Sequence, residues 1–144
     1  MFLGEYQHTL DAKGRVSLPR KFRDGTGGKL VVAKGLEHCL YVYPADGYRE
    51  FLENLMSASD FNQNSRAVRR FFTAGATEVD IDSAGRVSLS PPLREFASLG
   101  KDVVVAGVGD HIEIWDADAW AAYEDENATT IEDAAEELAR TGIL

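Results

Sequence analysis

The stretch DAKGRVSL at residues 11–18 recurs 71 positions later as DSAGRVSL at residues 82–89. The similarity continues on both sides of this octapeptide, where glycine, aliphatic and aromatic residues match. The matching pairs include Gly4 with Gly75, Leu10 with Ile81, Phe22 with Leu93, Leu40 with Ile112 and Tyr43 with Trp115. A unit of about 45 residues is on the small side to bury a core of its own. The repeat therefore predicts two halves that pack into one pseudo-symmetric domain and present two related surfaces.

The composition is that of a folded globule. The chain has 144 residues, of which 44% are hydrophobic and 10% aromatic, a balance typical of one compact domain or two very small ones. No run approaches the roughly 20 apolar residues that a membrane span needs, so we expect a soluble cytoplasmic protein. The lone cysteine, Cys39, lies in the apolar run 39–43 and is expected to be a buried small residue rather than a reactive thiol.

Charge is distributed very unevenly along the chain. The net charge is −9, yet residues 1–35 hold seven Lys or Arg against three Asp or Glu. Residues 36–101 hold seven against nine, and residues 102–144 hold one against twelve. The net charge taken alone argues against nucleic-acid binding, but a basic head with an acidic tail is a charge-asymmetry signal. The basic residues of the head overlap the first copy of the repeated octapeptide.

Strand patterns flank both copies of the repeat. Residues 6–10 and 77–81 alternate between apolar and polar, and residues 15–18 and 86–89 do so again, which is the period-2 pattern of half-buried strands. The intervening Asp-x-x-Gly predicts a turn in which Asp caps backbone amides and Gly adopts a positive φ. Each copy is thus predicted to be a hairpin, with an arginine just beyond its tip that faces away from the core.

The rest of the chain predicts a mostly β fold with helices, of the α+β class. Prolines at positions 19, 91 and 92 open short helical turns, with Phe22 and Leu93 as their inward residues. The further predicted elements are strands at 30–33, 40–43, 103–106 and 112–115, and helices that begin near 45 and 117 and cover about 61–73 and 130–139.

Two interpretations fit the repeated Asp-x-x-Gly-Arg. In the structural one, the Arg pairs with the Asp across the turn. In the functional one, the Arg reads DNA, because its planar fork of donors suits phosphate and the O6/N7 edge of guanine, and a two-stranded ribbon can enter a major groove. The cluster of cations around the first copy favours DNA binding. That cluster comprises Lys13, Arg15, Arg20, Lys21 and Arg23.

These residues closely resemble the bacterial MraZ family of transcriptional regulators, and each half is more distantly similar to the AbrB-type swapped-hairpin unit. The resemblance covers Met1 to about Tyr123. The motifs that carry it are Gly4, Asp11-x-Lys13-Gly14-Arg15, Pro19, Phe22-Arg23, Arg70-Phe71-Phe72, Asp82-x-x-Gly85-Arg86 and Pro92-Leu93-Arg94.

The resemblance implies a double-split β-barrel built from two AbrB-like repeats. Residues 1–73 would form the first repeat, with its core at about 5–47 and a helical linker. Residues 74–144 would form the second, with its core at about 76–119 and an acidic C-terminal tail. It also implies assembly into closed homo-oligomeric rings, a place in the nucleoid, and control of the division and cell-wall gene cluster.

The resemblance further implies contact with double-stranded DNA through the Asp-x-x-x-Arg segments, which fall here at Lys13, Gly14, Arg15 and Arg86. If the rings are built from head-to-tail interfaces, the operator should consist of short direct repeats. One position departs from symmetry, because Ala84 stands where the first copy has Lys13. We therefore expect unequal contributions from the two tips, with the acidic tail lying away from the DNA.

Other classes of function have weaker support. The histidines His8, His38 and His111 lack metal-ligand spacing, and neither a nucleophile elbow nor a phosphate-binding loop is present. We expect no catalytic residue, cofactor, metal, membrane partner or small-molecule substrate. The alternative that remains open is a ring-forming protein-interaction scaffold, or an AbrB-like antitoxin module, without specific DNA readout.

Overall fold

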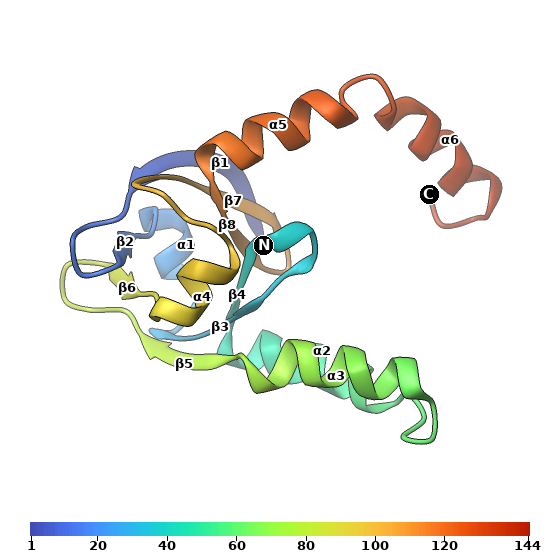
Figure 1. Ribbon diagram of the computed structural model, residues 1–144, viewed down its shortest axis with the longest axis horizontal. Coiled ribbons are helices and arrows are strands. Elements are labelled where there is room, and N and C mark those ends of the chain that lie inside the picture. Colours follow the sequence, from blue (N-terminus) through green and yellow to red (C-terminus); the bar gives the residue numbers. More distant parts are fainter.

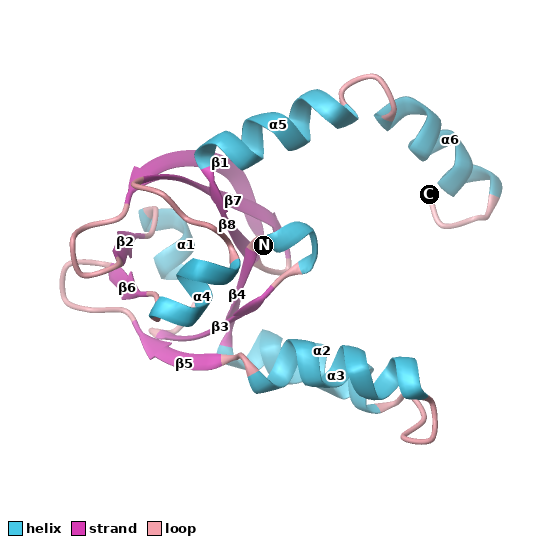
Figure 2. Ribbon diagram, in the orientation of Figure 1, coloured by secondary structure: helices cyan, strands magenta, loops and turns pink.

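The computed structural model describes residues 1–144 and shows an α+β protein, as predicted. The expectation of a mostly β fold is wrong, because more residues lie in helices than in strands; the two helical arms account for the excess. Figure 2 shows strands gathered at one end of the molecule and helices extending from it. The strands are β1 (Phe2–Thr9), β2 (Arg15–Ser17), β3 (Lys29–Lys34), β4 (Leu40–Pro44), β5 (Thr77–Asp80), β6 (Arg86–Ser88), β7 (Asp102–Gly109) and β8 (Ile112–Asp116). The helices are α1 (Arg20–Asp24), α2 (Ala45–Met56), α3 (Gln63–Ala74), α4 (Pro91–Phe96), α5 (Ala117–Asn127) and α6 (Ile131–Arg140), with a short 3₁₀ helix at Leu36–His38.

The strands form one six-stranded antiparallel sheet and one small ladder. The order in the sheet is β1-β7-β8-β4-β3-β5, and β2 pairs with β6 separately. The sheet curves around α1 and α4 (Figure 1), but its hydrogen-bonded ladder does not close, because β1 and β5 are its two edges. The two-stranded ladder lies beside the open side of the sheet, where the chain passes from β1 to β2 and from β5 to β6.

The two halves are related by a pseudo-two-fold axis. In the small ladder Val16 pairs with Val87, its own counterpart in the other repeat. In the large sheet β4 pairs with β8, and these are also equivalent strands of the two repeats. The first strand of each repeat pairs with the other repeat, β1 with β7 and β5 with β3. The prediction that the halves form one pseudo-symmetric domain is therefore confirmed.

The prediction that each copy forms its own hairpin is wrong. β1 does not pair with β2, nor β5 with β6; each of these strands pairs with a strand from elsewhere in the chain. The tight turn is present in both copies, but it leads the chain out of the large sheet and into the small ladder. Alternating residues fix which face of a strand is buried and do not fix the strand's partner, because pairing is a long-range choice.

The main core lies between the sheet, the small ladder and the two short helices. Val16, Val87, Phe22 and Leu93 are each at most 2% exposed, so the predicted inward residues of α1 and α4 are confirmed. Full burial of one such side chain contributes about 1.5–3 kcal/mol. The small ladder is thereby anchored to the core through one face, and its other face carries the arginines.

The other face of the sheet is covered by α2 and α3 on one side and by α5 on the other. Tyr43 stacks on Phe51 of α2 with ring centroids 5.2 Å apart, and Trp115 packs on Tyr123 of α5 at 5.0 Å. Cys39 is fully buried in this outer layer, as predicted. Burial raises the pKa of its thiol.

Two helical arms project from the end of the molecule opposite the small ladder. One arm is the α2–α3 hairpin and the other is α5 followed by α6, so the acidic tail lies away from the repeated turns (Figure 1). The predicted helix over the tail is confirmed as α6. None of the helices combines the length and apolar character that a membrane crossing requires.

Candidate nucleic-acid interface

The repeated turns are built by their aspartates. Asp11 Oδ1 accepts hydrogen bonds from the backbone N–H groups of Lys13 and Arg15, both at 2.9 Å. Asp82 Oδ1 accepts equivalent bonds from Ala84 and Arg86, also at 2.9 Å. A carboxylate that bonds amides two and four residues further along closes a tight turn without help from the sheet. The turn chemistry predicted from Asp-x-x-Gly is therefore confirmed in both copies.

The second oxygen of each aspartate holds the arginine. Arg15 Nε donates to Asp11 Oδ2 at 2.6 Å, and Arg86 Nε donates to Asp82 Oδ2 at 2.9 Å. The structural interpretation of the motif, an Asp–Arg pair, is thus correct. This pairing is compatible with DNA binding by Arg15, because neither Nη group of Arg15 forms a hydrogen bond within the chain and both can donate to DNA. The pair fixes the direction of the guanidinium and leaves its outer edge available.

Both arginines are only partly exposed. The exposed side-chain fraction is 27% for Arg15 and 33% for Arg86, so they lie along the turn instead of extending freely into solvent. Backbone hydrogen bonds, those from Arg15 and Arg86 first, lower the pKa of Asp11 and Asp82 below its ordinary value, and the arginine side chains lower it further. The carboxylates are therefore ionised at neutral pH and pair with the arginines as full charges.

Each turn is also in contact with the opposite repeat. Leu18 N donates to Gly85 O at 3.0 Å, and Leu89 N donates to Gly14 O at 2.9 Å. Gly14 has φ +74° and Gly85 has φ +80°, in the left-handed region that favours glycine. A Cβ at Gly14 would lie 2.7 Å from the guanidinium carbon of Arg94. A Cβ at Gly85 would clash in the same way with the guanidinium of Arg23.

Arg23 and Arg94 are the part of the site that sequence reasoning missed. Arg23 was grouped with the cations behind the first tip, yet it lies against the second, and Arg94 of the second repeat lies against the first turn. The signal was present, because the two arginines are themselves 71 residues apart and both follow the inward residue of a short helix. Only the crossing of the two repeats places each beside the other's turn.

These residues together define the tip face. Lys13 is exposed at the first turn, and Ala84 occupies the equivalent place at the second. Five cations and two carboxylates gather on the tip face, namely Lys13, Arg15, Arg23, Arg86 and Arg94 with Asp11 and Asp82. Guanidinium groups in fixed orientation on a two-stranded ribbon can donate to phosphate or to guanine in a major groove. The structure brings three of the four residues predicted to bind DNA, Lys13, Arg15 and Arg86, together on this face, whereas Gly14 is buried against Arg94.

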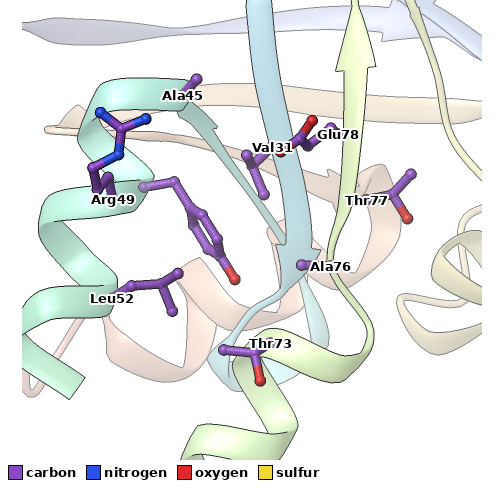
Figure 3. Close-up of a pocket in the computed structure, with 9 residues that line it drawn as sticks. Val31, Ala45, Arg49, Leu52, Thr73, Ala76, Thr77 and Glu78 are labelled. Atoms are coloured by element: carbon purple, nitrogen blue, oxygen red, sulfur yellow. The ribbon is translucent and has the colours of Figure 1, made fainter. Parts of the chain in front are cut away.

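A separate groove lies between α2 and the edge strand β5 (Figure 3). Its volume is about 370 Å³. Val31 and Leu52 form part of its apolar lining, and its two charged side chains are Arg49 and Glu78. Neither histidine nor cysteine lines it. Elsewhere in the chain, no three His, Cys, Asp or Glu side chains gather as metal ligands would.

The fold therefore consists of two interlocked repeats, and the ribbon formed by one strand of each repeat carries both Asp–Arg turns. Comparison with known proteins gives the particular family. Residues 1–71 and 72–141 each match the family model of the MraZ protein, which its description calls antitoxin-like. The chain belongs to the MraZ family and contains two MraZ repeats.

Relatives from several bacteria are similar over the full length. The chain is 43% identical to the transcriptional regulator MraZ of Acetivibrio thermocellus over 143 residues, which cover 99% of this chain and 100% of that protein. It is 45% identical over 138 residues to the proteins of the same name from Carboxydothermus hydrogenoformans and Moorella thermoacetica, with 96% of each chain covered.

Proposed function

We propose that this protein is a DNA-binding transcriptional regulator that contacts its operator through the tip face, with Lys13, Gly14, Arg15 and Arg86 at the contact. The observation that carries the proposal is the pairing of both Asp–Arg turns in one ladder, where each arginine is held through Nε by the aspartate of its own turn and the Nη groups of Arg15 make no hydrogen bond within the chain. The names of the relatives, all transcriptional regulators, support it. A transcriptional regulator is not a class of enzyme.

The mechanism follows from the chemistry of the tip. Asp11 holds Arg15 in one orientation before DNA arrives, so less conformational freedom is lost when the guanidinium donates to guanine O6 and N7. Lys13 is exposed on a flexible stem and suits a phosphate. Gly14 is buried, and its positive φ closes the turn that places Lys13 and Arg15 beside it. Arg86 repeats the role of Arg15 at the second turn.

The acidic net charge is compatible with DNA binding because of where the acids lie. Residues 102–144 carry twelve acidic residues against one basic residue, and many of them lie on the α5–α6 arm at the end opposite the tip face (Figure 1). Beyond a Debye length, about 8 Å at physiological salt, their repulsion of phosphate is screened. The local charge of the tip face therefore governs affinity.

Several finer features are part of the same proposal. The chain divides near residue 73 into two repeats that together resemble a double-split barrel. Copies assemble into a ring, the operator consists of direct repeats, and the regulated genes are those of division and cell-wall synthesis. Such a protein acts in the cytoplasm, on the nucleoid. The rival proposal is a protein-interaction scaffold or an antitoxin module without specific DNA readout. The family description, which calls the protein antitoxin-like, agrees with the second of these.

The test is binding of the purified protein to the DNA upstream of its own gene, measured by fluorescence anisotropy at two salt concentrations. We expect specific binding that exceeds binding to a shuffled duplex and weakens as salt rises, because phosphate contacts release counterions. Equal affinity for both duplexes would exclude specific readout and favour the scaffold alternative. A variant with Arg15→Ala and Arg86→Ala serves as the negative control.

A further inference from the structure

The two repeats meet at the middle of the large sheet along a short seam. There β4 of the first repeat pairs with β8 of the second over only three residues of each strand, whereas the ladder between β1 and β7 has eight. Helix α2 continues from the end of β4 and α5 from the end of β8, so the roots of both arms lie at this seam (Figure 1). A seam with so few backbone pairs depends on the side chains that cross it.

His111, which immediately precedes β8, is such a side chain. Its ring stacks on Tyr43 of β4, with centroids 4.7 Å apart and an interplanar angle of 16°. The ring of Tyr41, also in β4, lies 4.5 Å away. Only 13% of the His111 side chain is exposed. An imidazole from the second repeat is thus held in the aromatic layer of the first.

Both ring nitrogens of His111 face carboxylates. Nδ1 lies 2.7 Å from Asp110 Oδ1, and Nε2 lies 3.3 Å from Glu113 Oε2. A neutral imidazole has one N–H and can donate to only one of these oxygens, whereas the imidazolium donates to both. Without its proton, the ring would turn a lone pair toward a carboxylate in a place that is largely closed to water. The arrangement therefore fits the protonated form of His111.

Asp110 and Glu113 are the charged groups that face the ring. No lysine or arginine pairs with either carboxylate. Burial alone would lower the pKa of His111, but the hydrogen bonds to Glu113 and Asp110, together with the charges of these carboxylates, outweigh it and raise the pKa above its ordinary value of 6.5. The two carboxylates thus favour the cation.

The other titratable groups of this layer stay neutral while His111 changes charge. Burial raises the pKa of Tyr41, Tyr43 and Tyr48 and that of the Cys39 thiol. The helices contribute uncharged side chains to the layer, namely Tyr48, Phe51 and Leu52 from α2, Phe72 from α3, and Trp120 and Tyr123 from α5. Near neutral pH the charge of the layer therefore changes at His111.

The partners of His111 connect it to the roots of both arms. Glu113 Oε1 accepts a hydrogen bond from Trp115 Nε1 at 3.0 Å, and Trp115 packs on Trp120 of α5 with ring centroids 5.3 Å apart. Tyr43, on which the imidazole stacks, packs in turn on Phe51 of α2. One protonation site thus contacts the side chains that anchor α2 and those that anchor α5.

We propose that His111 is a pH-sensitive link between the two repeats, which in its protonated form ties Asp110 and Glu113 to the tyrosines of β4. Loss of the proton removes one of the two hydrogen bonds and the attraction between the cation and the tyrosine rings. The side-chain layer at the roots of both arms then loosens. The tip face lies across the core from this layer, so the link is independent of the proposed DNA contact.

The direction of the pH effect follows from linkage. A group with a raised pKa in the folded state stabilises the fold fully below its unfolded pKa, and this contribution is lost as pH rises through the folded pKa. For His111 the unfolded value is 6.5 and the folded one lies above it. The link is therefore complete in mild acid and opens on the alkaline side of neutrality.

The first test follows the imidazole signals of the intact chain by NMR, with His111 assigned by comparison with His111→Gln. We expect His111 to titrate above pH 6.5. Glu113→Gln and Asp110→Asn should each lower its midpoint, because each removes the charge of one acceptor. A midpoint at or below 6.5 in the intact chain would overturn the proposal, as would a midpoint that neither substitution moves. The intact chain alone decides the first of these outcomes, even if a variant folds poorly.

The second test compares thermal midpoints across pH for the intact chain, His111→Gln and the matched control His38→Gln. His38 is an exposed histidine that stacks on Phe96 and pairs with no carboxylate. We expect the intact chain to exceed His111→Gln by the widest margin at about pH 6 and the margin to narrow toward about pH 9. His38→Gln should show no such pH dependence. A margin that stays constant from acid to alkaline pH would give His111 a packing role only and overturn the proposal.

The third test locates the response. The chain has two tryptophans, Trp115 and Trp120, and they contact each other in this layer, so tryptophan emission reports its packing. We expect the emission of the intact chain to change with the midpoint that NMR gives for His111, and His111→Gln to lack this transition while His38→Gln keeps it. A transition that persists in His111→Gln would assign the pH response to another group and reject the link.

Discussion

Arg86 reaches across the small ladder to the aspartate of the other repeat, with its Nη1 3.8 Å from Asp11 Oδ2. Asp11 Oδ2 also accepts the hydrogen bond from Arg15. One carboxylate oxygen thus lies beside the arginines of both repeats, and the two turns form a single charged unit. Substitutions at the two tips should therefore have non-additive effects on stability and binding, because residues that share a partner do not behave independently.

Arg15→Ala should remove specific DNA binding while the thermal midpoint falls only slightly. Loss of one bidentate contact with guanine costs about 1–3 kcal/mol per site, whereas an arginine on a partly exposed turn adds little to the core. Arg86→Ala should weaken binding less, because the second tip lacks the lysine of the first. Anisotropy and thermal melts on the same samples check both statements. A parallel fall of midpoint and affinity would assign the arginines a structural role alone.

Asp11→Asn combined with Asp82→Asn should lower stability at neutral pH and have little effect in acid. The folded-state pKa of both carboxyls lies below its ordinary value of 3.8, so the unfolded chain binds protons first as pH falls. Their contribution is complete above the unfolded pKa and is lost as pH falls through the folded one. Thermal midpoints from pH 7 down to pH 2 should therefore converge for the two proteins. Midpoints that stay separated by the same amount in acid would show that the carboxylate charge is irrelevant.

Gly14→Ala should be clearly more damaging than Gly27→Ala. Both glycines have positive φ, +74° and +67°, so both substitutions strain the backbone by roughly 1 kcal/mol. At Gly14 the new Cβ would also meet the guanidinium of Arg94, while nothing lies within 4 Å at Gly27. Urea unfolding measures the difference, and DNA binding should fall only for Gly14→Ala. Equal losses at the two glycines would mean that Arg94 moves aside freely.

Ala84→Lys should strengthen DNA binding without improving specificity. It restores at the second tip the lysine that the first tip has, and a lysine on phosphate adds a contact that every sequence offers. The slope of log K against log salt should steepen by about 1 for the added contact. Ala84→Gln is the neutral control. An unchanged slope would place position 84 away from the phosphates.

Operators built as direct repeats should be bound far better when the repeats recur once per helical turn. Head-to-tail copies present every tip face in the same sense, so repeats spaced by about 10 base pairs can be contacted together and repeats at about 15 cannot. Affinity should rise steeply with the number of repeats, because later tips bind at high effective concentration. Duplexes with inverted repeats are the control. Preference for the inverted arrangement would exclude the head-to-tail order.

The octapeptide and its copy determined much of this protein by local chemistry. An aspartate can bond only the amides that the chain places within its reach, and a turn that needs positive φ selects glycine, so both turns follow from DAKGR and DSAGR alone. Alternation marked the buried faces of β2 and β6, and prolines with inward Phe22 and Leu93 marked the short helices. The similarity of the two halves could also be predicted from the sequence, because similar segments of sequence favour similar local structures.

Tertiary structure alone decided which strands meet. The alternating pattern of residues 15–18 is satisfied by any partner that covers Val16, and the chain uses β6 of the other repeat instead of the neighbouring β1. That exchange places Arg94 at Gly14 and Arg23 at Gly85 and brings Arg86 to Asp11. Contacts between residues about 70 positions apart depend on the closure of long loops and on the packing of the whole core, and no local preference encodes them.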